Sequence, residues 1–220
     1  MERELTMEEL RVLGCLLEKE MATPDYYPLT MNHLLNACNQ KSNRDPVVSY
    51  DETTVLQTID ALRDINLAFR VDLIDSRVPK YEHNMGKKLE LTVQELAIMC
   101  VMMLRGALTL AKIKERTTRL YPFGDRDEVE ITLDGLMERE PPLVVRFPPM
   151  PGQKEARYAH LLAGEPDIPE PSASVSREVR TVVAGVDAER IEQLESEVAD
   201  LRGKLETLQE QFETFKAQFE

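Results

Sequence analysis

The chain has 220 residues, of which 42% are hydrophobic and 30% are charged, and its formal net charge is −13. These proportions are typical of a soluble globular protein with one or two domains. The longest apolar run, Leu96 to Leu104, is less than half of the roughly 20 residues that a membrane-spanning helix needs. The N-terminal segment also lacks the pattern of a secretion signal. We therefore expect a cytoplasmic protein with no membrane partner.

The negative charge is concentrated near the C-terminus. Residues 166–220 carry 6 basic and 13 acidic side chains, which gives −7, whereas residues 1–88 and 89–165 carry −4 and −2. The overall acidity therefore says little about most of the surface, and local groups of charges must indicate the partner.

The first elements in chain order are three predicted helices and a β-hairpin. Thr6 and Glu9 have the spacing of a capping box, so a helix begins there. Segments 28–36 and 51–65 predict the second and third helices, and Asp51 precedes the third. The run "LAFRVDLI" and the later "PKYEHNM" then predict two strands joined by a turn.

The same order of elements recurs in the next part of the chain. "LTMEELRVLGCLLEKE" matches "LTVQELAIMCVMMLRG", and "PKYEHNM" matches "ARYAHLL", with the matching third helix beginning at Asp125 or Asp127. Such internal repeats indicate a duplicated structural unit. Three helices and a hairpin form a winged helix, so we predict a mainly α protein with small β-hairpins. Its domains are two tandem winged-helix (helix-turn-helix) domains, at 1–88 and 89–165. The apolar run at 96–104 is expected to pack between them, and the alternative is that it contacts a partner.

Several long motifs resemble one known family. "RVLGCLLEKEMATPDYYPLTMNHLLNACNQKSNRDPVV", "RVPKYEH" and "EARYAHLLAGEP" are similar to the YceH family of uncharacterised bacterial proteins. The resemblance covers about residues 5–166. It implies a bacterial cytoplasmic protein with a tandem winged-helix fold, but it supplies no activity.

The C-terminal part predicts a linker and a dimerising helix. Segment 166–187 is rich in Pro and Ser, as exposed linkers are. Residues 188–220 have apolar side chains at alternating steps of three and four, the heptad pattern of a coiled coil. A homodimer is therefore expected, and the alternative is a single amphipathic helix folded back on its own chain. The predicted dimerisation residues are Ile191, Leu194, Val198, Leu201, Leu205, Leu208, Phe212 and Phe215, with Phe219 continuing the pattern.

The third helices do not resemble ordinary DNA-recognition helices. Winged helices usually place this helix in the major groove, yet segment 51–65 exposes mainly acidic and neutral side chains, with Arg63 as its only cation. The matching helix of the second repeat is more acidic still. Carboxylates repel phosphates, so base reading by either helix is not expected.

The loop "ACNQKSNRDP", Ala37 to Pro46, is the candidate nucleic-acid contact. Its polar and basic side chains are of the types that contact phosphate and sugar, and wing cations are expected beside them. The second helix of the second repeat adds further cations, at 112–119. The alternative is that the loop is structural, since Asn and Asp stabilise turns without a ligand. The predicted nucleic-acid-binding residues are Asn39, Gln40, Lys41, Asn43, Arg44, Arg77 and Lys80.

No residues indicate catalysis, a metal, a cofactor or a small-molecule ligand. Gly-rich phosphate loops, nucleophile elbows and zinc motifs are missing from the sequence. The three cysteines are interpreted as reduced core residues, and His83 and His160 as fold-supporting. Tyr26 and Tyr27 are interpreted as loop anchors. We therefore expect a non-enzymatic dimer that is a gene-regulatory DNA-associated protein, and the alternative is a protein–protein adaptor that uses its acidic third helices and apolar surfaces.

Overall fold

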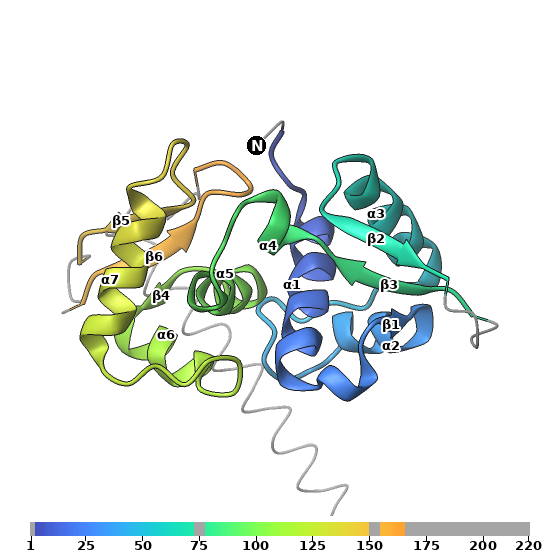
Figure 1. The fold of residues 1–220 in the computed structure, drawn as a ribbon, viewed down its shortest axis with the longest axis horizontal. Helices are drawn as coiled ribbons and strands as arrows, with labels where there is room; N and C mark the ends of the chain where they lie inside the picture. Colours follow the sequence, from blue (N-terminus) through green and yellow to red (C-terminus); the bar gives the residue numbers. More distant parts are fainter. Residues whose placement is uncertain (1–2, 73–77, 150–154, 166–220) are drawn as a thin grey trace, which may run out of the picture. The chain divides into compact units, whose positions relative to one another are not determined.

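The computed structural model describes residues 3–72, 78–149 and 155–165. Within these ranges the chain forms seven α-helices and two small antiparallel sheets of three strands each (Figure 1). None of the helices found there is both long and apolar enough to cross a bilayer. The predicted linker, the predicted coiled coil with all its dimerisation residues, and Arg77 lie outside the described residues.

The first repeat contains the elements that the sequence predicts. They are α1 (Met7–Ala22), α2 (Met31–Cys38), α3 (Glu52–Asp64), β2 (Ala68–Val71) and β3 (Lys80–His83), and a short strand β1 (Leu29–Thr30) precedes α2. Thr6 and Glu9 form the predicted capping box, and the Asp51 side chain accepts a hydrogen bond from the Thr54 amide at the start of α3. The sheet order is β1-β3-β2, with Thr30 and Val71 both paired to Lys80.

The second repeat has the same order of elements. They are α5 (Val93–Arg105), β4 (Leu108–Thr109), α6 (Leu110–Thr117), α7 (Arg126–Met137), β5 (Val144–Phe147) and β6 (Arg157–His160), with sheet order β4-β6-β5. Thr92 and Glu95 form the second predicted capping box, and Asp125 caps α7. A short helix, α4 (Met85–Lys88), lies between the repeats in the chain. Each repeat is compatible with a small winged-helix-like domain.

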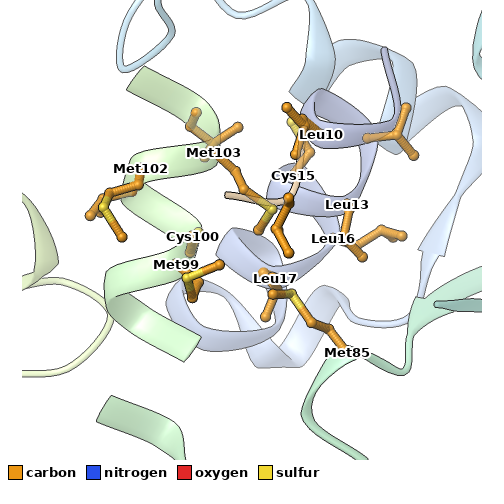
Figure 2. Packing of buried hydrophobic residues seen from close by; sticks show 14 of the residues in the cluster. Leu10, Leu13, Cys15, Leu16, Leu17, Met85, Met99, Cys100, Met102 and Met103 are labelled. Carbon is orange, nitrogen blue, oxygen red and sulfur yellow. The ribbon is translucent and has the colours of Figure 1, made fainter. Parts of the chain in front are cut away.

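The first helices of the two repeats pack against each other. All eight residues of α5 from Ala97 to Leu104 are buried, which confirms that the apolar run packs between the repeats. Figure 2 shows side chains of α5, including Met99 and Met103, directed toward α1. The two repeats therefore share one hydrophobic cluster.

Gly14 packs closely against α5. A Cβ atom at this position would lie 2.9 Å from Cδ2 of Leu104, a distance that real Cβ atoms do not tolerate. The Gly14 carbonyl oxygen also accepts a hydrogen bond from the Cys100 thiol at 3.4 Å. A residue without a side chain fits best here, because any Cβ would force the Leu104 side chain to shift.

Candidate nucleic-acid interface

The outward faces of both third helices are acidic, as the sequence predicts. Glu52, Asp60 and Asp64 are exposed on α3, and Arg63, the only cation of that helix, donates to Asp60 at 2.6 Å. On α7 the exposed side chains include Asp127, Glu130 and Asp134. Because these carboxylates are solvent-exposed and largely unneutralised, neither helix offers phosphate a favourable contact.

Asn39 has a structural role in the predicted contact loop. Its Oδ1 accepts from the Tyr50 amide at 2.7 Å, and its Nδ2 donates to the Tyr50 carbonyl oxygen at 2.8 Å. The two bonds close the long connection between α2 and α3 at the residue just before the N-cap of α3. The Asn39 amide group is therefore committed to the backbone and is not a free contact for a ligand.

Arg44 is not on the surface, which corrects its expected role as a nucleic-acid contact. The residue is only 6% exposed, and its guanidinium makes a bidentate pair with Glu18, at 2.7 and 3.1 Å. Its Nε also donates to the Ala37 carbonyl oxygen at 3.1 Å. Burial alone raises the pKa of Glu18, but the hydrogen bond and charge of Arg44 outweigh it and hold that pKa below the ordinary value. Arg44 thus fastens the loop to α1.

The other loop side chains border a cleft between the repeats. This cleft has a volume of about 610 Å³ and lies between the end of α1, the loop at 40–43, the end of α5 and α6. Its lining carries five cationic side chains and two acidic ones, an excess of three positive charges in a chain of net charge −13. We call the five the cleft cations: Lys19, Lys41, Arg105, Arg116 and Arg119.

The cleft cations differ in how far they are already neutralised. Lys41 and Arg119 are exposed and make no hydrogen bond or ion pair with any residue that the structure describes. Arg105 donates to Oδ1 of Asn43, and Arg116 lies 3.6 Å from the carboxylate of Glu115. Burial lowers the pKa of Arg105, and the positive charges of Arg116 and Arg44 lower it further. Cations that crowd one another in this way form an attractive site for an anion.

Lys80, the predicted wing cation that the structure describes, does not join the cleft. Lys80 lies in β3, opposite Thr30 and Val71, and is not among the residues that line the cleft. The structure thus gathers Gln40, Lys41 and Asn43 from the predicted set and combines them with cations of the second repeat.

Two cleft cations were missed by the sequence reasoning. Lys19 stands in the last turn of α1, and Arg105 ends the apolar helix α5. A cation at a helix C-terminus is common, because it complements the helix dipole, so neither residue attracts attention in the sequence. Their equivalent places at the ends of the two matching first helices are the signal that indicates a shared surface.

The tyrosines of "TPDYYPLT" have different roles. Tyr27 is an anchor, since its hydroxyl oxygen accepts from the His83 amide at 2.7 Å, and Nε2 of His83 lies 2.5 Å from the Glu20 carboxylate. Tyr26 is 69% exposed, which corrects the interpretation of it as a second anchor. All three cysteines are buried and unpaired. In the described ranges no group of three potential ligands is placed to hold a metal ion.

Known proteins similar to this chain carry no assigned activity in their names. Residues 5–153 match the family described as DUF480, protein of unknown function. A UPF0502 protein of Geobacter sulfurreducens is 47% identical over 213 residues, 96% of each chain. UPF0502 proteins of Geotalea uraniireducens and Vibrio parahaemolyticus are each 46% identical, over 100% and 97% of this chain and 100% and 99% of their own. These matches agree with the resemblance to an uncharacterised bacterial family.

Proposed function

We propose that this chain, which belongs to the DUF480 family of proteins of unknown function, is a non-enzymatic, gene-regulatory protein that associates with DNA through its phosphate backbone. In this proposal the repeats at 1–88 and 89–165 are winged-helix domains. The observation that supports it most is the excess of positive charge at the cleft, where both repeats contribute cations. The acidic third helices argue for contact with the backbone in place of base reading in the major groove.

The cleft cations can neutralise phosphates, which is why DNA is the proposed partner. Lys41 and Arg119 are exposed and unpaired in the described structure, so they lose little when they exchange water for phosphate oxygens. Arg116 has a weak partner at 3.6 Å that a phosphate can displace. Each such contact releases counterions from DNA, which makes binding sequence-independent and strongly dependent on salt.

Binding to a labelled duplex of mixed sequence tests the proposal. Fluorescence anisotropy at about 50 and 200 mM salt should show affinity that falls steeply as salt rises. The double substitution of Lys41→Ala with Arg119→Ala should flatten the log–log slope by about 2, or about 1 for each cation that no longer meets a phosphate. Lys80→Ala removes a cation outside the cleft and is the matched control, with an unchanged slope. Failure to bind at low salt contradicts the proposal.

The proposal also includes a homodimer made by the C-terminal heptads. Two copies of the chain would bring two clefts to one DNA molecule, and linked sites gain affinity through effective concentration. Sedimentation of the full chain and of a variant with Leu201→Glu and Leu208→Glu, both at heptad positions, tests this part. A dimer that the substitutions convert to a monomer supports it, whereas equal masses for both proteins contradict it.

A protein–protein adaptor is the second candidate function. Exposed apolar side chains stand among the carboxylates of both third helices, Leu56 at 43% exposure on α3 and Ile131 at 71% on α7. A partner with basic and apolar side chains would complement these faces. The duplex titration separates the two candidates, because an adaptor of this kind has no salt-dependent affinity for DNA.

A further inference from the structure

A second, smaller hollow adjoins the cleft. This hollow has a volume of about 220 Å³ and shares Lys19, Thr23 and Gln40 with the lining of the cleft. Its other walls come from the first repeat and include Tyr26, Leu29 and His33. The two hollows therefore adjoin, with cations concentrated in the larger one and an aromatic residue in the lining of the smaller one.

Tyr26 is held so that its ring stays available. The turn Pro24–Tyr26 is fixed at both ends, by bonds from the Tyr26 amide to the Thr23 carbonyl oxygen at 3.1 Å and from the Tyr27 amide to the Pro24 carbonyl oxygen at 3.0 Å. The anchoring of Tyr27 by the His83 amide holds the next residue as well. The Tyr26 ring is nevertheless 69% exposed. A rigidly carried, exposed aromatic ring beside a basic groove is the arrangement on which nucleic-acid bases stack.

We propose that the two hollows together bind a nucleoside phosphate, with its base on Tyr26 and its phosphates among the cleft cations. The proposal rests on the proposed function in one respect, since it uses the same cations. The volumes suit this class of ligand, because sites for small molecules of this size usually enclose about 300–1,000 Å³. The polar groups of His33 and Gln40 line the smaller hollow, where they can meet the edge of a base.

The lining of the larger hollow fits the rest of such a ligand. Val101, Leu104 and Leu120 give it an apolar part beside the cations. Lys19 lines both hollows, so in this proposal it meets the phosphate nearest the sugar, which would compete with the Glu18 carboxylate that now lies 3.3 Å from its ammonium group. Arg105 and Arg116 then face the outer phosphates, and a polyanion would relieve the repulsion between them.

A free nucleotide and an unpaired nucleotide of a single-stranded nucleic acid would present the same chemical groups to this site. Calorimetric titrations of the full-length protein with ATP, with a single-stranded 12-mer of thymidine and with inorganic tripolyphosphate distinguish them. Tripolyphosphate carries the charge of ATP without a base. We expect ATP or the 12-mer to bind more tightly than tripolyphosphate, and the tighter of the two identifies the source.

The variant Tyr26→Ala provides the decisive comparison. Loss of base stacking should weaken binding of the preferred ligand about 5- to 150-fold and leave tripolyphosphate binding unchanged. Tyr26→Phe keeps the stacking surface and should bind as the natural protein does. Because Tyr26 is exposed, both variants should unfold at the temperature of the natural protein, which checks that the fold is intact.

Three results bear on the inference and on the proposed function separately. The inference is wrong if tripolyphosphate binds as tightly as ATP and the 12-mer. It is also wrong if Tyr26→Ala leaves the affinities for both ATP and the 12-mer unchanged. Duplex binding together with failure of ATP and the 12-mer also overturns it, but leaves the proposed function standing. Nucleotide binding sensitive to Tyr26, without any binding of duplex, supports the inference and removes the proposed function.

Discussion

Replacement of Arg44 by Met should destabilise the fold strongly. The Arg44 side chain is fully buried, and that of Glu18 is 16% exposed. The substitution leaves a largely buried carboxylate with only Lys19, at 3.3 Å, as its partner, and the Ala37 carbonyl oxygen without its donor. Breaking a buried ion pair from one side costs about 3–5 kcal/mol. Because the Glu18 side chain is partly exposed to water, we expect a cost at the lower end of this range, about 3 kcal/mol.

Urea unfolding followed by circular dichroism measures this cost. The double variant of Arg44→Met with Glu18→Leu should recover most of the loss, because a buried ion pair replaced by apolar side chains of similar size is often nearly neutral. Lys41→Met is the matched control in the same loop. It removes an exposed and unpaired cation, so it should change stability by no more than about 0.5 kcal/mol.

Equal effects of Arg44→Met and Lys41→Met would refute the assignment of Arg44 to the interior. So would a double variant less stable than Arg44→Met alone. The same two substitutions should have the opposite ranking in DNA binding, since Lys41 faces the cleft and Arg44 fastens the loop beneath it. A stability effect and a binding effect are thereby assigned to neighbouring cations of one loop.

Three further predictions concern buried groups. Burial lowers the pKa of His160 from 6.5 to about 4, so in this pH range the side chain stays neutral in the folded protein while the unfolded chain takes up a proton. The free energy of unfolding should therefore fall by about 3 kcal/mol as the pH drops from 6.5 towards 4. In urea unfolding, His160→Gln should flatten this pH dependence. Gly14→Val should lower the midpoint of thermal unfolding, because its side chain meets Leu104 at a cost of about 1–3 kcal/mol, and an unchanged midpoint would contradict the close packing. A thiol reagent should react slowly with the native protein and fast in denaturant, since all three thiols are buried: Cys15, Cys38 and Cys100.

Local signals made much of the fold predictable. The capping boxes at Thr6 and Thr92 depend on residues three apart, and they define the starts of α1 and α5 as predicted. The repeat gave the order of helices and hairpins twice, so each copy supports the other. The two-residue strands β1 and β4 were not predicted, because two residues carry no periodicity.

The candidate site was less predictable, because its residues meet only through tertiary packing. The partner of Arg44 is 26 residues away in the sequence, and a basic residue in a polar loop is expected to be exposed unless that partner is known. The cleft cations come from both repeats, and their meeting depends on how α1 packs on α5. The different exposures of Tyr26 and Tyr27 follow from one distant contact with β3.

The contact at Gly14 also bears on the spacing of the two helices whose ends line the cleft. Lys19 belongs to the same helix as Gly14, and Arg105 follows Leu104, the residue pressed against that glycine. Close packing of α1 against the Leu104 side chain opposes sliding of the two helices past each other. The ends of α1 and α5 that line the cleft are thus held at a set distance. An anion that bound there would meet charges already in position, and little of its binding energy would be lost to rearranging the protein.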